Sequence, residues 1–280
     1  MTTAPTTRRA DPAVRRPAFR DALRSEWIKL LSLPSPFLAL GGILAVGLGG
    51  SLFLGLTLES SGVPSVASVE RTIGDVTLPM VILGQIIAGI AGVSSVGAEY
   101  SSGSIQTTLM AVPTRVRVLW AKAIVAFLAV TGTALTTVFG AWLATYPLYA
   151  EHGLQAPLTA PGVLLALLGS AVYLGLCAVF GVGIGMLVRS TTIGAVVVFT
   201  ATLLGPILAS ALPFNLFSRL ARVALLGNAG DAMARVGTPG GPFLDVWGGH
   251  ISTAAGWLLV AAWAALALAG GAVALQRRDA

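Results

Sequence analysis

Apolar residues dominate six long stretches of the chain, and polar residues gather in the segments between them. A bilayer core of about 30 Å needs roughly 20 apolar helical residues, and each stretch reaches that length. The predicted spans are residues 37–58, 78–98, 118–147, 162–188, 193–213 and 251–275. The third and fourth are long enough to tilt or to project from the membrane. The pattern therefore predicts an all-α membrane protein with six transmembrane helices.

A helix predicted over residues 18–33 precedes the first span, and it is amphipathic. Its apolar stripe, at helical spacing, consists of Phe19, Leu23, Trp27 and Leu30. The charged residues off this stripe are Arg20, Asp21, Arg24 and Lys29. Such a helix lies in the membrane interface, with its apolar face against the acyl boundary and its cations toward headgroups and cytosol. Pro34 and Pro36 end it before the first span.

Two carboxylates are predicted at positions where a negative charge is unfavourable without a partner. Glu26 falls at the margin of the apolar stripe, where it is either a solvated surface group or a charge that requires a partner. Lys29, three residues on, is one candidate partner, and a basic residue of another element is the other. Glu99 falls at the inner end of the second span, where the helix dipole disfavours a carboxylate. A nearby cation, or the N-terminus of the next short helix, should compensate it.

The segment between the second and third spans predicts a short surface helix over residues 105–111. Gly103 favours a turn, Ser104 can cap the helix, and Pro113 ends it. The apolar side of this helix consists of Ile105, Leu109 and Met110. Such an element can dock into the groove of a partner protein, or it can lie flat on the membrane.

Composition agrees with the membrane assignment, because 55% of the 280 residues are apolar and 10% are charged. A soluble domain carries about 25% charged residues. The 17 Lys and Arg against 11 Asp and Glu give a net charge of +6. Four basic residues fall in predicted outer segments, namely Arg71, Arg219, Arg222 and Arg235, and the other 13 of the 17 fall in inner ones. This bias places both termini in the cytoplasm and removes the need for a nucleic-acid partner.

The N-terminal region is expected to be a flexible cytoplasmic tail over residues 1–17 rather than a targeting peptide. Arg15 and Arg16 resemble a twin-arginine signal loosely. The apolar run begins some twenty residues later, is too long for the hydrophobic part of a signal peptide, and has no prompt cleavage site.

The predicted spans lack an ionisable residue in their middle, which disfavours proton- or ion-coupled transporters and voltage sensors. Backbone carbonyl groups could still bind Na⁺. The deepest polar side chain is Gln85, either an interhelical hydrogen-bonder or a contact on a substrate path. Abundant glycines, such as Gly92 in the second span and Gly181 in the fourth, suit close helix packing, a dimer seam or a sliding surface.

The chain also lacks the residues of the commonest catalytic and metal sites. A P-loop needs Gly-Lys-Ser/Thr, but Lys29 follows Ile28 and Lys122 follows Ala121. His152, His250 and Cys177 are isolated, without ligand-like spacing. We therefore expect no catalytic residue, no metal and no cofactor bound by this chain.

Two motifs resemble a known family. The sequence RSEWIKL before the first span, and E-Y-x-x-G-S-x-x-x-x-L-x-x-V-P-T-R from Glu99 onward with a later lysine, look like membrane subunits of ABC-2 type ATP-binding-cassette exporters. The likeness covers essentially the whole chain, including a long outer loop before the last span. One departure is Ser104, where family members often carry Thr. Either hydroxyl can cap a helix.

The resemblance implies a mechanism. Residues 105–111 would be a coupling helix seated on a separate ABC ATPase subunit that binds ATP and Mg²⁺, and residues 18–33 would be a connecting helix that also touches it. The coupling residues implied are Glu99, Tyr100, Gly103, Ser104, Ile105, Thr108, Leu109, Pro113 and Arg115. Those of the connecting helix are Arg24, Glu26, Trp27 and Lys29. Two such permeases, identical or related, would assemble with two ATPases in a bacterial-type plasma membrane, and residues 215–250 would include short re-entrant helices at the outer exit.

Two other function classes remain open at this stage. A rhomboid-like intramembrane serine protease also has six spans, and its nearest candidates here are Ser170 and His250, although Gly169-Ser170-Ala171 departs from the expected Gly-x-Ser-Gly. A non-ABC membrane scaffold or half of a secondary transporter is the third reading, without a visible second-half repeat.

Overall fold

The computed structural model describes residues 18–62, 68–101, 103, 115–213, 215–237 and 251–278, and within these ranges it contains helices and no strand. Six helical stretches are long and apolar enough to cross a membrane: Pro34–Leu56, Val69–Tyr100, Val116–Glu151, Val163–Val188, Thr191–Ser210 and Thr253–Arg277. The prediction of an all-α, multi-pass membrane protein is confirmed. The tail over residues 1–17 and the short helix over residues 105–111 lie outside the described residues.

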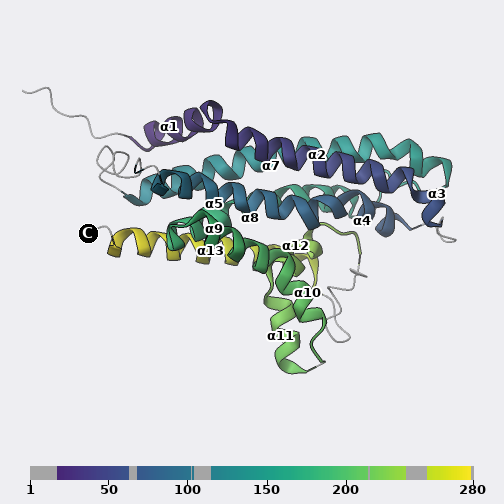
Figure 1. Ribbon diagram of the computed structural model, residues 1–280. Coiled ribbons are helices and arrows are strands. Elements are labelled where there is room, and N and C mark those ends of the chain that lie inside the picture. The colour runs from purple at the N-terminus through teal and green to yellow at the C-terminus, as the bar shows by residue number, and fades with distance from the viewer. Residues whose placement is uncertain are drawn as a thin grey trace, which may run out of the picture.

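The long helices lie side by side in one bundle (Figure 1). Helix α1 (Phe19–Ser32) is followed by α2 (Pro34–Leu56), and the remaining long helices are α5 (Gln85–Ser101), α7 (Arg115–Glu151), α8 (Val163–Val188) and α13 (Thr253–Arg278). Helix α8 is apolar on all sides and central. In its most apolar 18 residues 67% are buried, against 17% in the corresponding part of α2. Helix α1 and the C-terminal end of α13 lie at the same end of the bundle (Figure 1).

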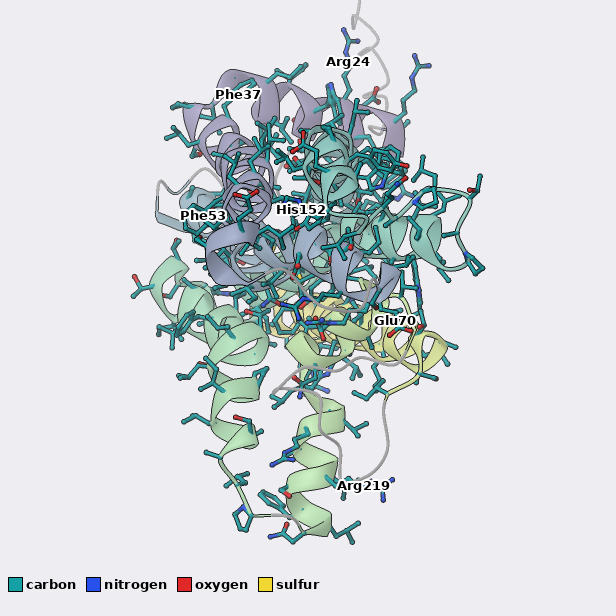
Figure 2. All side chains as sticks on the ribbon, turned by 90° about the vertical axis from the view of Figure 1, so that its right-hand side faces the viewer. Arg24, Phe37, Phe53, Glu70, His152 and Arg219 are labelled. Atoms are coloured by element: carbon teal, nitrogen blue, oxygen red, sulfur yellow. The ribbon has the colours of Figure 1, made fainter. Side chains whose placement is uncertain are left out.

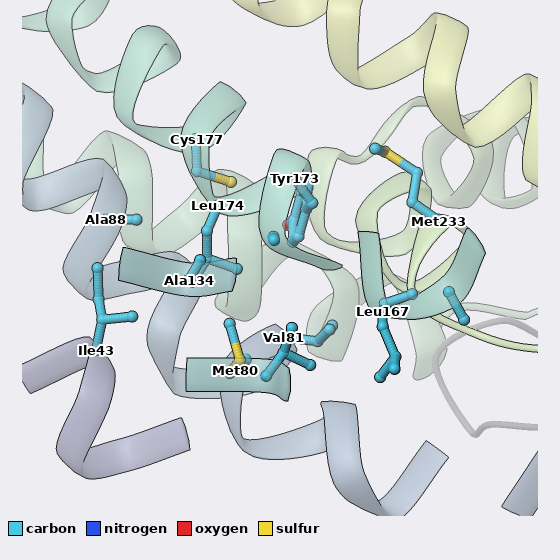
Figure 3. Packing of buried hydrophobic residues seen from close by; sticks show 14 of the residues in the cluster. Ile43, Met80, Val81, Ala88, Ala134, Leu167, Tyr173, Leu174, Cys177 and Met233 are labelled. Carbon is cyan, nitrogen blue, oxygen red and sulfur yellow. The ribbon is translucent and has the colours of Figure 1, made fainter. Parts of the chain in front are cut away.

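Glycines bring the backbones of α5 and α8 into direct contact. A Cβ atom at Gly92 would lie 2.0 Å from the carbonyl oxygen of Ala178, and one at Gly181 would lie 2.0 Å from that of Gly89. Gly183 meets the backbone of α13 at Ala267 in the same way. These glycines therefore serve packing within the chain. Figure 3 shows the adjoining core, where side chains such as Met80, Leu174 and Cys177 pack together.

The second span is longer than predicted. Helix α4 (Val69–Pro79), the π-helical segment η1 (Met80–Gly84) and α5 form one continuous helix, whereas the sequence prediction began at residue 78. Polar residues hid the first part, but their side chains are satisfied inside the bundle. The hydroxyl of Thr72 donates to the carbonyl oxygen of Leu154 at 2.9 Å, and that of Thr77 donates to the carbonyl oxygen of Ala234 at 3.1 Å. A short helix α3 (Leu58–Ser61) precedes this span.

The fifth span bends away from the bundle and leads to two short helices. It consists of α9 (Thr191–Phe199), the π-helical segment η2 (Thr200–Leu204) and α10 (Gly205–Ser210), and α11 (Leu216–Ala224) and α12 (Leu226–Met233) follow. Helices α10 and α11 project sideways (Figure 1), with Arg219 near the far end (Figure 2). Helix α12 instead packs against α8 and α13. Residues 238–250 lie outside the described part of the chain.

Candidate functional site

The amphipathic helix α1 packs on the bundle through Ala22 and Glu26, which are buried. The predicted apolar stripe is divided, because Leu23 and Leu30 are half-buried and Trp27 is 43% exposed. Lys29 points toward the bundle and binds Glu26, as one predicted pairing had it, and does not point away with Arg20 and Arg24. The physical reason is that carboxylates of α1 and α5 hold its ammonium group. Arg24, on the exposed side of α1, projects outward as predicted (Figure 2).

Four charged residues from three helices form one ion cluster, which consists of Glu26, Lys29, Glu99 and Lys122. The Nζ atom of Lys29 lies 2.6 Å from Glu26 Oε1 and 2.7 Å from Glu99 Oε1. The Nζ atom of Lys122 lies 2.6 Å from Glu26 Oε2 and 3.0 Å from Glu99 Oε1. It also donates to the carbonyl oxygen of Ser95 at 3.1 Å. Two positive and two negative charges therefore balance, and they join α1 to α5 and α7.

The two lysines differ in burial and in hydrogen bonding. The side chain of Lys122 is 4% exposed, and its three N–H donors all have acceptors. The side chain of Lys29 is 32% exposed, and two of its donors bind carboxylates. Burial lowers the pKa of Lys29, but its hydrogen bonds and attraction to Glu26 and Glu99 outweigh burial and raise the pKa above the ordinary 10.5. The cluster is therefore buried at Lys122 and reaches the surface at Lys29.

Both candidate partners of Glu26 are present, because Lys29 and a cation of another helix each bind one of its oxygens. The same two lysines compensate Glu99 near the C-terminal end of α5. Sequence reasoning missed Lys122 as a member of this site. One signal was available: Lys29 and Lys122 are the chain's two lysines among 15 arginines. A compact ammonium group fits between two carboxylates where a planar guanidinium group does not.

The C-terminal end of α5 is also fixed to the turn between α8 and α9. The guanidinium carbon of Arg189 lies 5.2 Å from the centroid of the Tyr100 ring, in cation–π geometry. Arg189 closes α8 in the left-handed conformation, with φ of 56°. Gly103 has φ of +72°, as the predicted turn requires. Ser104, Ile105, Thr108, Leu109 and Pro113 lie outside the described residues, and Arg115 is the first residue of α7, with its side chain also outside them.

Gln85 belongs to a second, uncharged network deep in the bundle. It is 3% exposed, and its Nε2 atom donates to the carbonyl oxygens of Ile82 at 3.3 Å and Thr202 at 3.2 Å. The hydroxyl of Tyr173 donates to its Oε1 atom. Of the two readings of Gln85, the structure shows the interhelical hydrogen-bonder, and the contact on a substrate path stays a prediction.

The candidates for the other chemistries are described only in part. Ser170 is fully buried on α8, and its hydroxyl donates to the carbonyl oxygen of Leu167 at 2.8 Å, while His250 lies outside the described part. Within the described ranges, His, Cys, Asp and Glu residues form no group of three that could hold a metal ion. Arg222, predicted near the outer surface, is 3% exposed and binds the carbonyl oxygens of Ala209 and Leu212.

The bundle and the ion cluster define a multi-pass helical membrane protein whose helix α1 is fixed to two spans by buried charges. No protein-family model matches the chain, and no curated protein matches it.

Proposed function

We propose that this chain is the membrane-spanning permease subunit of an ABC exporter of the ABC-2 type. It would move an amphipathic or hydrophobic substrate out of the cytoplasm, driven by ATP hydrolysis on a separate ATPase subunit. Two permease chains and two ATPase subunits would form the working complex. Under this proposal, the end of the bundle that carries α1 faces the cytoplasm.

The ion cluster is the observation that supports the proposal most. The segment over residues 102–114 connects the end of α5 to the start of α7, and both of these ends are ion-paired to α1. A force applied to that segment or to α1 would therefore reach three helices at once. Charges buried at a helix junction resist separation, because pulling one partner away leaves the other uncompensated. This arrangement suits the transmission of an external push.

The transport energy would then come from outside the spans, which agrees with their content. Other ionisable side chains in the described part of the bundle, such as Asp75 and the Asp231–Arg235 ion pair, lie near helix ends, and the middle of the second span contains the uncharged network of Gln85 and Tyr173. Membrane-embedded ion-coupled transporters generally use ionisable groups at that depth. An ATPase partner removes this requirement. The motifs around Glu26 and Glu99, which resemble the ABC-2 family, support the same reading.

The test is reconstitution with a P-loop ATPase encoded by a neighbouring reading frame. The two proteins should copurify, and ATP hydrolysis in proteoliposomes should rise when the permease is present. A Leu109→Asp variant, which puts a charge on the apolar side of the predicted coupling helix, should insert normally but lose that stimulation. Leu158→Asp is the matched control, because Leu158 is 37% exposed in the loop at the opposite end of the bundle.

Normal stimulation in the Leu109→Asp variant, or transport that continues when the ATPase subunit is absent, would refute the proposal. Transport that stops on proton-gradient collapse and ignores ATP depletion would favour a secondary transporter instead.

A further inference from the structure

A cavity of about 110 Å³ adjoins the ion cluster. Helices α1, α2, α5, α7 and α8 contribute to its wall, and its residues run from Glu99 to Ala91 along α5 and from Lys122 to Val130 along α7. Eight residues of α-helix span about 12 Å. The cavity is therefore elongated along the helices, with the four charged side chains at one end.

The other end of the cavity is apolar. Its lining there includes Leu40, Ala91, Ala126, Ala129 and Val130. Three serines also line the cavity. Ser35 is at the start of α2, the hydroxyl of Ser94 donates to the carbonyl oxygen of Ala91, and the hydroxyl of Ser95 donates to the carbonyl oxygen of Gly92. A polar group in this part of the cavity would lose its hydration without gaining partners, whereas a hydrocarbon chain would not.

The charged end offers one hydrogen-bond donor to an incoming group. Lys29 gives two of its three N–H donors to carboxylates, and its side chain is 32% exposed. Lys122 gives all three donors to protein acceptors. An acceptor that carries negative charge, such as a phosphate oxygen, is the group that best complements the remaining donor of Lys29.

The turn between α1 and α2 contributes to the cavity wall, and the helices on either side of it carry exposed apolar side chains. Leu33, which lines the cavity, is 48% exposed at the turn between α1 and α2. Ile28 and Leu31 of α1 are each 55% exposed, and Phe37 of α2 is 51% exposed. In a membrane protein such a surface contacts lipid, so an occupant can enter from the bilayer without crossing water.

We infer that this cavity binds the headgroup-proximal part of one acyl chain of a membrane phospholipid, with the lipid phosphate on Lys29. The occupant thus has a polar end and an apolar end in the same order as the cavity. The inference goes beyond the proposed function, because it needs neither an ATPase nor transport.

The test uses the purified full-length chain, delipidated in detergent, with lipid occupancy counted by native mass spectrometry. The probe is 1-oleoyl lysophosphatidylglycerol, which has one chain and one phosphate. Monoolein supplies the chain without the phosphate, and inorganic phosphate supplies the anion without the chain. We expect one tightly bound lysolipid per chain and no competition by inorganic phosphate. Monoolein should bind about tenfold more weakly than the lysolipid, because it lacks one charge-assisted hydrogen bond.

Two variants change the two ends of the cavity separately. Lys29→Gln removes the charge and should weaken lysolipid binding by about tenfold while leaving monoolein binding unchanged. Ala129→Phe fills the apolar end and should abolish binding of both lipids. The matched controls are Arg24→Gln, an exposed cation of the same helix, and Leu128→Phe, whose side chain is 54% exposed next to Ala129 on α7. Both controls should bind as the unmodified chain does.

Each variant is compared only if it elutes as a single species in size-exclusion chromatography. The two variants lie at separate positions, so a folding defect in one leaves the other as a test. The inference is overturned if Ala129→Phe retains the lysolipid, if Leu128→Phe loses it equally, or if inorganic phosphate displaces it. Equal binding of monoolein and lysolipid would overturn the role of Lys29.

Discussion

The ion cluster and the network around Gln85 are two polar clusters in one apolar bundle, and they solve the same problem differently. The ion cluster lies where α1 meets the ends of α5 and α7, and it contains four formal charges. The Gln85 network lies deeper, between α5, α8 and η2, and its groups are an amide, a phenol and backbone carbonyls. Of these two clusters, the charged one has a member that reaches the surface, Lys29, and the neutral one is buried at Gln85 and Tyr173.

The comparison teaches what each cluster contributes. A buried ion pair is a weak source of stability, but it is costly to break, so it fixes the geometry of the helices that it joins. A neutral hydrogen bond costs less to lose. The end of the bundle that carries α1 is therefore joined more strictly than the interior. Variants in both clusters test this ranking.

The largest effect is expected for Lys122→Met. This change leaves Glu26 and Glu99 with one cation between them, in a site where Glu26 is 6% exposed. Removing one partner from a buried ion network costs about 3–5 kcal/mol. The measurement is thermal unfolding of the purified protein in detergent. The double variant Lys122→Met/Glu26→Gln restores charge balance and should recover most of the loss. A double variant no more stable than the single one would contradict the assignment of charge imbalance as the cause.

An intermediate effect is expected for Gln85→Leu. The hydroxyl of Tyr173 and the carbonyl oxygen of Thr202 would lose a partner at a site that is 3% exposed. An unsatisfied buried polar group costs about 1–3 kcal/mol. Adding Tyr173→Phe removes one orphaned hydroxyl and should restore part of the stability. If Gln85→Leu proves more damaging than Lys122→Met in the same unfolding assay, the ranking of the two clusters is reversed.

The smallest effect is expected for Lys29→Met, at about 1 kcal/mol near neutral pH, because its side chain is a third exposed and partly screened by solvent. The pKa of Lys29 is raised in the folded protein. Its contribution is therefore complete below pH 10.5, the ordinary pKa of lysine, and is lost as pH rises through the folded pKa. The gap in unfolding temperature between the unmodified chain and this variant should close above pH 10.5. A gap that grows with pH would contradict the sign of the shift.

Hydropathy and spacing predicted much of this fold. The six spans and the helix before them follow from long apolar runs, from Pro34, and from the amphipathic pattern that begins at Phe19. The start of the second span could not be predicted that way, since Thr72 and Thr77 read as loop residues until their hydroxyls find carbonyl groups of distant segments. A hydropathy scale rates each side chain alone and does not include the hydrogen bonds that it makes in the fold.

The candidate site was predicted in part, for a related reason. The cost of burying Glu26 and the dipole at Glu99 both indicated that a cation was needed. Which cation supplied it depended on tertiary contacts between residues 96 and 23 positions apart. Those contacts also decide which face of α1 packs on the bundle. The spacing of apolar residues placed Lys29 on the outward face, but Lys29 binds Glu99 and therefore faces α5.

The glycine contacts between α5 and α8 have a consequence for any motion of the bundle. At Gly92 and Gly181 the two backbones lie too close to admit any added side chain. We therefore expect α5 and α8 to keep their mutual position, and changes of shape to occur in the helices that pack less closely against them. Helix α2, with most of its surface facing outward, and the bent fifth span are those helices. Under the proposed function, a transport cycle would move these outer helices while α5 and α8 stay in place.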